Sequence, residues 1–274
     1  MHKSSPIGFF DSGYGGLTVL KEVQKVLPQY DYLYLGDNKR APYGTRTAET
    51  VYEYTWECVK TLFDKGCELV VLACNTASAK ALRRIQQYDL VDYPGKRVLG
   101  VIRPSAEIVG DYSKTNQIVV LGTEGTIASN TYIDEFEFLS PQTKVDQYPC
   151  PLWVPLIESR NHNTQEGKSL IKKDLDFIVN TFKKADVILL GCTHYPILQK
   201  FIEDNVPEGV QVISQGEIVA VSLKSYLERH TWMQGKLTEG GSTMYLTTGN
   251  PKEFEDFAST ILGIDVNVEQ INIK

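Results

Sequence analysis

Short apolar runs alternate with amphipathic segments along almost the whole chain. The run at residues 7–10 precedes a segment of helical spacing at residues 17–27. A second run at residues 32–35 is followed by a helical segment at about 47–66, one face of which carries the positions i, i+4, i+7 and i+8 counted from Val51. The alternation predicts repeated strand–helix units.

The same order continues to the end of the sequence. Further strands are predicted at residues 69–73, 97–102, 118–121, 187–190, 210–213, 243–247 and 266–273. Helices are predicted after residue 75, from Pro104, near Ser129, over 167–184, from Pro196, over 217–232 and over 250–263, and a loop is expected around 149–155. Continuously apolar strands separated by helices indicate mostly parallel sheets, which bind ligands at the carboxyl ends of their strands.

Two segments, 68–76 and 186–194, match each other position by position. Each has an acid, four aliphatic residues, a small residue, a cysteine and two hydrogen-bonding residues. A weaker similarity relates residues 7–13 to residues 119–123. Such self-similarity predicts two related halves, each of which presents one cysteine at a strand end facing a shared cleft.

These two cysteines, Cys74 and Cys192, suit proton transfer at a carbon. A thiol between a strand end and a helix start lies near the positive pole of the helix, which favours the thiolate. Inversion of a carbon centre needs a base on one face and an acid on the other, and two facing thiols can supply both. An isolated cysteine is more often an inert buried side chain, but polar residues follow both of these at a strand end. We interpret them as an acid/base pair.

A glycine-rich loop at residues 11–16 follows the first predicted strand. Its backbone N–H groups could bind a carboxylate or a phosphate. Asp37 ends the second strand, where a ribose-binding acid lies in dinucleotide-binding folds. The loop is not a G-x-G-x-x-G motif, and Asp11 would repel a pyrophosphate. Asp11 is equally suited to cap a helix.

Other polar residues cluster near the predicted strand ends. His194 could orient or deprotonate Cys192, or ligate zinc with it, although no C-x-x-C pair accompanies them; we favour the acid/base role. The rigid segment 42–44 could close on an anionic ligand. Thr123 and Thr126 could bind a carboxylate or cap a helix.

Composition narrows the class of ligand and the compartment. The 274 residues include 28 Lys and Arg against 34 Asp and Glu, a formal net charge of -6, so we expect neither nucleic acid nor a membrane surface as a partner. The longest apolar runs are too short to span a bilayer. Five scattered cysteines favour free thiols over a disulfide framework. We expect a cytoplasmic protein with a small-molecule ligand.

Four motifs, in their order and spacing, resemble the bacterial glutamate racemases of the PLP-independent aspartate/glutamate racemase family: residues 10–16, 36–44, 73–78 and 190–196. The resemblance implies two pseudo-symmetric flavodoxin-like α/β domains with mostly parallel sheets and the active site in the cleft between them. The first domain would be discontinuous, comprising residues 1–100 plus 213–274 and carrying Cys74. The second would comprise residues 101–212 and carry Cys192.

The resemblance also implies the reaction and the roles of residues. L-glutamate and D-glutamate would be interconverted without a cofactor or metal, supplying D-glutamate for peptidoglycan, by a protein that we expect to be a homodimer. Asp11 would assist Cys74, and His194, held by Glu158, would assist Cys192. Substrate contacts are implied for Asp11, Ser12, Pro42, Tyr43, Gly44, Asn75, Thr76, Thr123, Thr126, Thr193 and His194.

Three alternatives remain open from the residues alone. Another two-thiol enzyme, such as an aspartate or hydantoin racemase, would carry the same chemistry. A nucleotide-binding oxidoreductase would use the glycine-rich loop and Asp37, and a non-catalytic protein would only hold an acidic metabolite in the cleft. Arg103 and Ser214 stand where the family pattern favours acids, which bears on the domain interface and not on the chemistry.

Overall fold

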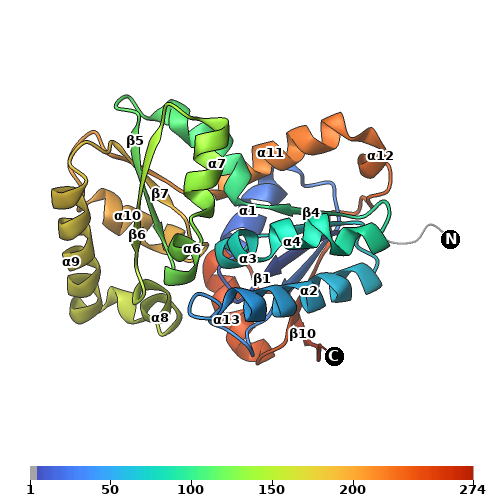
Figure 1. Ribbon diagram of the computed structural model, residues 1–274. Coiled ribbons are helices and arrows are strands. Elements are labelled where there is room, and N and C mark those ends of the chain that lie inside the picture. Colours follow the sequence, from blue (N-terminus) through green and yellow to red (C-terminus); the bar gives the residue numbers. More distant parts are fainter. Residues whose placement is uncertain (1–4, 274) are drawn as a thin grey trace.

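The computed structural model describes residues 5–273 and contains two parallel sheets that lie side by side (Figure 1). The six-stranded sheet has the order β10-β9-β2-β1-β3-β4, and the four-stranded sheet has the order β6-β5-β7-β8. Their strands are β1 (Ile7–Asp11), β2 (Tyr32–Gly36), β3 (Leu69–Leu72), β4 (Arg97–Gly100), β5 (Gln117–Gly122), β6 (Lys144–Pro149), β7 (Val187–Leu190), β8 (Gln211–Ile213), β9 (Thr243–Thr247) and β10 (Val268–Gln270). The expected class, an α/β fold of two halves with parallel sheets, is confirmed.

Helices cover both faces of each sheet. Successive side chains of a strand point to opposite faces, so Phe9 and Phe10 of β1 enter two different buried clusters. Around the six-stranded sheet lie α1 (Leu17–Val26), α2 (Ala48–Asp64), α3 (Asn75–Lys80), α4 (Leu82–Gln87), α11 (Gly216–Arg229), α12 (Thr231–Gln234) and α13 (Pro251–Leu262). Around the other lie α5 (Ile102–Ile108), α6 (Glu124–Ala128), α7 (Thr131–Leu139), α8 (Trp153–Glu158), α9 (Gln165–Thr181) and α10 (Gln199–Glu203), and the 3₁₀ turns are η1 (Asp89–Asp92), η2 (Val109–Tyr112), η3 (Asn161–Asn163) and η4 (Tyr195–Leu198).

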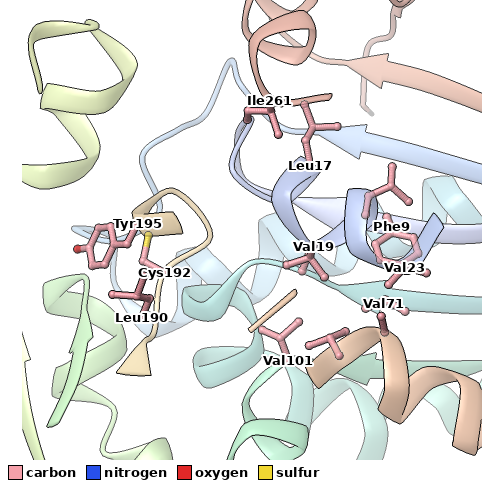
Figure 2. Packing of buried hydrophobic residues seen from close by; sticks show 14 of the residues in the cluster. Phe9, Leu17, Val19, Val23, Val71, Val101, Leu190, Cys192, Tyr195 and Ile261 are labelled. Atoms are coloured by element: carbon pink, nitrogen blue, oxygen red, sulfur yellow. The ribbon is translucent and has the colours of Figure 1, made fainter. Parts of the chain in front are cut away.

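One buried cluster extends from the first sheet to the second. Figure 2 shows Phe9, Val23 and Val71 of the six-stranded half together with Leu190 and Tyr195 of the other half. Burial of apolar surface stabilises a protein by about 25 cal/mol per Å², so a cluster shared between the halves also holds them against each other.

The two sheets repeat one strand order. The order β2-β1-β3-β4 corresponds to β6-β5-β7-β8, so β3 and β7 occupy equivalent places, as do β1 and β5. Cys74 follows β3 and Cys192 follows β7. The internal similarities in the sequence therefore reflect equivalent positions in space, and both thiols lie beyond the carboxyl end of a central strand.

Several predicted elements differ from the structure. The strand β6 was not predicted, because it lies at a sheet edge and its partly exposed side chains, from Lys144 to Pro149, do not form an apolar run. The helix expected near Ser129 is two helices, α6 and α7, separated by Asn130 in the left-handed region at φ 56°.

Other boundaries shift by a few residues. The helix expected to open at Pro104 begins at Ile102, so β4 is shorter than predicted. The long helix expected over 217–232 breaks at His230 into α11 and α12, and the predicted helix at Pro196 begins as the 3₁₀ turn η4. The last strand is limited to β10 within the expected 266–273.

Two further properties of the described residues concern helix length and the state of the cysteines. None of the helices within residues 5–273 combines the length and the apolar character needed to cross a bilayer. All five cysteines are free thiols, as the sequence predicted, and all five are buried.

Candidate active site

A cavity between the two sheets contains both cysteines. The wall comes from turns at the carboxyl ends of strands in each sheet, which is where parallel sheets bind ligands. Its lining residues are Ser12, Gly13, Ala41, Pro42, Tyr43, Gly44, Thr45, Cys74, Asn75, Thr76, Thr123, Glu124, Cys150, Pro151, Val154, Pro155, Glu158, Cys192, Thr193 and His194. Most of the residues singled out in the sequence therefore meet here.

Cys74 caps the start of α3. Its sulfur accepts a hydrogen bond from the Ala77 N–H at 3.4 Å and lies 3.4 Å from the Ser12 hydroxyl. Burial, together with the charge of Asp11, raises the pKa of the Cys74 thiol to about 12, although the contacts with Ser12 and Ala77 act to lower it. The expected preference for a thiolate is wrong for Cys74, because burial outweighs the helix start.

Asp11 lies fully buried beneath the cavity and does not line it. One carboxylate oxygen accepts from the Gly13 N–H at 2.8 Å, and the other accepts from the Thr193 hydroxyl at 3.3 Å. Burial raises the pKa of Asp11, whereas the charge of His194 and these hydrogen bonds lower it. Asp11 thus contacts the segment that carries Cys192, and it acts on Cys74 through charge.

Cys192 belongs to a line of three polar groups. The His194 Nδ1 atom lies 4.0 Å from the Cys192 sulfur, and Nε2 lies 3.0 Å from Oε1 of Glu158, at the end of α8. Burial alone would lower the pKa of His194, but the hydrogen bonds with Cys192 and Glu158 raise it to about 10. At neutral pH His194 is therefore an imidazolium that faces Cys192 with one nitrogen and Glu158 with the other.

Asp37 binds the segment 42–44 through the hydroxyl of Tyr43. Its carboxylate accepts from the hydroxyls of Tyr43 and Thr248 and from the guanidinium of Arg40. Asp37 is fully buried and does not line the cavity, so its carboxylate is not available to a ribose. The alternative of a dinucleotide site therefore lacks the acidic residue that would bind the ribose. The Tyr43 hydroxyl is likewise bound to Asp37, which leaves the ring and the backbone to face the cavity.

The segment 42–44 closes one side of the cavity against the other sheet. The Gly44 carbonyl accepts from the Gly125 N–H at 2.8 Å, and a Cβ at Gly44 would lie 2.9 Å from the Thr123 Cβ. Only glycine permits this approach. Thr123 lines the cavity and also caps α6, with its hydroxyl 2.9 Å from that of Thr76. Thr126 is buried behind both hydroxyls and does not line the cavity.

One wall of the cavity was predicted only in part from the sequence. Cys150, Pro151, Val154 and Pro155 supply its apolar part, in a segment that was expected to be a loop. Trp153 and Ile157, four residues apart and buried on one face of α8, were the available signal of a helix.

The alternative of a zinc site at Cys192 and His194 finds no third ligand. Within residues 5–273, no group of three or more His, Cys, Asp or Glu side chains could hold a metal ion. The partners of His194 are Cys192 and the single carboxylate of Glu158.

Comparisons with known proteins show which family the chain resembles. Residues 17–223 match the family model for Asp/Glu/Hydantoin racemase. A glutamate racemase of Streptococcus suis is 37% identical over 268 residues, covering 98% of both chains. The crystal structure of a Bacillus anthracis glutamate racemase is 35% identical and superposes with a TM-score of 0.90 over 99% of both chains.

A third relative is the glutamate racemase of Francisella tularensis, whose structure was solved in complex with D-glutamate. It is 28% identical to this chain, with a TM-score of 0.86 over 99% of this chain and 98% of that one. Because the family model spans most of the sequence and the relatives match over nearly their whole length, this protein belongs to the Asp/Glu/Hydantoin racemase family, whose members are isomerases.

Proposed function

We propose that this racemase interconverts L-glutamate and D-glutamate without a cofactor, with Cys74 and Cys192 as the two acid/base residues. The observation that carries the proposal is that two thiols from equivalent strand ends of the two sheets line one cavity. Relatives named glutamate racemase, and the D-glutamate complex of the Francisella tularensis protein, support glutamate as the substrate.

The surroundings of the thiols suggest how the proton moves. In one direction the Cys192 thiolate, stabilised by the His194 imidazolium, takes the proton from Cα, and the electron pair stays on the carbon. Cys74, whose raised pKa retains its proton, then donates that proton to the opposite face. Cys192 ends as a thiol and Cys74 as a thiolate, which is the starting state for the reverse reaction.

Hydrogen-bond donors around the cavity would hold the two carboxylates of glutamate. Ser12, Asn75, Thr76 and Thr193 line it together with Pro42, Tyr43, Gly44, Thr123 and His194. Asp11 and Thr126, which lie behind this lining, would act through Thr193 and Thr123. Donors fixed by the fold bind a charged ligand without a large cost in ordering.

Several further features belong to the proposal. Residues 1–100 plus 213–274 would form one domain and residues 101–212 the other. The strands of the two sheets divide in the same way except that β8 of the four-stranded sheet ends at Ile213, one residue past the proposed boundary. The protein would act in the cytoplasm, where free thiols such as these five persist, and would supply D-glutamate for peptidoglycan. The expected assembly is a homodimer, which light scattering of the purified protein would test.

Solvent exchange tests the chemistry most directly. Incubation of either glutamate enantiomer in D₂O, with no added PLP or metal, should place deuterium at Cα as racemisation proceeds. A protein that only binds the ligand would give no exchange, and that result would contradict the proposal. Aspartate provides the matched substrate, and faster turnover of aspartate than of glutamate would overturn the substrate assignment.

A further inference from the structure

Three buried side chains from different elements form a closed ring of hydrogen bonds beside Cys74. Tyr132 of α7 donates its hydroxyl to Oδ1 of Asn75 at 2.6 Å. Asn75 Nδ2 donates to Oε1 of Gln215 at 2.7 Å, and Gln215 Nε2 donates to the Tyr132 oxygen at 2.8 Å. No more than 3% of the surface of any of the three residues is exposed.

The chemistry of the neighbours fixes the direction of this ring. The Val101 carbonyl, which can only accept, lies 3.1 Å from the same end of the Gln215 side chain that faces Tyr132, so that end is the NH₂ group. The opposite end is the carbonyl, which must accept from the NH₂ group of Asn75. Burial raises the pKa of Tyr132, so its hydroxyl keeps the proton that it donates to Asn75.

The ring leaves one donor of Asn75 unused. Within residues 5–273, Nδ2 donates to Gln215 alone, although the group carries two hydrogens, and Asn75 lines the cavity directly after Cys74. If the amide were reversed, its oxygen would replace this donor and would repel a carboxylate.

We propose that Tyr132 and Gln215 are positioning residues that hold the Asn75 amide with an N–H available to a substrate carboxylate. This inference rests on the proposed function. The ring joins α3 beside the six-stranded sheet, α7 beside the four-stranded sheet, and the residue that precedes α11. The donor is therefore fixed in place only while these elements of the two halves keep their relative positions.

A double-mutant cycle tests whether Tyr132 acts through Asn75. Tyr132→Phe removes the hydroxyl that orients the amide, and we expect KM for D-glutamate to rise about 10-fold while kcat changes less than about 3-fold. In an Asn75→Ala background, the same change should alter kcat/KM by less than about 2-fold. Gln215→Leu, which keeps a similar volume without burying a charge, removes both the donor to Tyr132 and the acceptor for Asn75, and should raise KM similarly and show the same non-additivity.

Tyr32→Phe is the matched control. It also deletes a buried hydroxyl, bound to the Leu27 carbonyl at 2.6 Å, but Tyr32 does not line the cavity, so KM should not change. Additive effects of Tyr132→Phe and Asn75→Ala, or a fall in kcat alone that follows the folded fraction measured by circular dichroism, would overturn the inference. If the unaltered enzyme does not turn over glutamate, the proposed function is wrong. If it does and the two changes are additive, only the positioning role of Tyr132 and Gln215 is wrong.

Discussion

The two thiols differ in the groups that surround their sulfur atoms. Cys74 is contacted by a hydroxyl and a backbone N–H and lies near the charge of Asp11, so burial and that charge hold its proton. Cys192 faces an imidazolium that Glu158 helps to keep charged. Equivalent positions in the two sheets thus present one group suited to donate a proton and one suited to accept it.

Removal of either thiol tests this division of labour. We expect Cys74→Ser and Cys192→Ser each to lower kcat for glutamate racemisation by about 10³-fold in both directions, because a serine hydroxyl is a far weaker acid than a thiol and one-sided chemistry cannot invert the centre. Cys67→Ala, a buried thiol that does not line the cavity, is the control and should retain kcat/KM. Near-normal turnover by either serine variant would contradict two-base catalysis.

Glu158→Gln should change the pH dependence of activity. The carboxylate helps to raise the pKa of His194 to about 10, so its loss lowers that pKa and neutralises the imidazole at a lower pH. We expect the alkaline limb of the profile of kcat/KM against pH to move toward neutrality. Glu49→Gln, which removes an exposed carboxylate paired with Arg84, is the control and should leave the profile in place.

The same pair should contribute to stability in a defined pH range. Because the pKa of His194 is higher in the folded protein than its ordinary value of 6.5, its contribution is fully present below pH 6.5 and is lost as the pH rises through about 10. Thermal unfolding of the Glu158→Gln variant should therefore differ from that of the unaltered protein more near pH 6 than above pH 10. An equal difference at pH 6 and above pH 10 would argue against a charged His194.

At the scale of elements, the loop between β1 and α1 must approach the turn after β7 very closely. A Cβ at Gly15 would lie 2.4 Å from the Thr193 hydroxyl oxygen and 2.5 Å from Nδ1 of His194. We expect Gly15→Ala to displace His194, to lower kcat/KM at least 10-fold and to destabilise the protein by about 1–3 kcal/mol. Gly235→Ala, at a helix end where the nearest atom would be 3.4 Å away, should change neither quantity appreciably.

Strands buried on both faces could be predicted because nothing in them interrupts the apolar run. β3 and β7 are completely buried, and their sequences contain only Val, Leu and Ile. β6 was not predicted because side chains of an edge strand can stay partly exposed, so its sequence contains no continuous apolar run. The boundary between α6 and α7 was not predicted because it depends on one residue in the left-handed region, Asn130.

Residues of the site that directly follow a predicted strand could be found from the sequence. Cys74 and Cys192 were found from a duplicated pattern, and the structure brings them into one cavity. Tyr132 and Gln215 gave no such signal, because their role depends on contacts with Asn75 across 57 and 140 residues. The ribose-binding alternative for Asp37 stayed open in the sequence for the same reason, since its partner Thr248 lies far away along the chain.

At the scale of the whole molecule, the cavity has walls from both halves, and the buried cluster of Figure 2, which includes Cys192, connects the same two halves. Direct polar contacts also join the halves beside the cavity, among them the Thr76 and Thr123 hydroxyls at 2.9 Å and the Gly125 N–H, which donates to the Gly44 carbonyl at 2.8 Å. A ligand in the cavity would add contacts to both halves at once.

Substrate should therefore stabilise both halves together. Glutamate at 100 times its Kd should raise the free energy of unfolding by about 2.7 kcal/mol, because it binds only the folded protein. Hydrogen exchange should slow at the starts of α3 and α6 alike, since Asn75 and Thr123 both line the cavity and come from different halves of the molecule. Sodium chloride at equal ionic strength controls for screening. Protection confined to residues 101–212, with no change near Asn75, would show that the ligand binds one half alone and would contradict a site shared by the two cysteines.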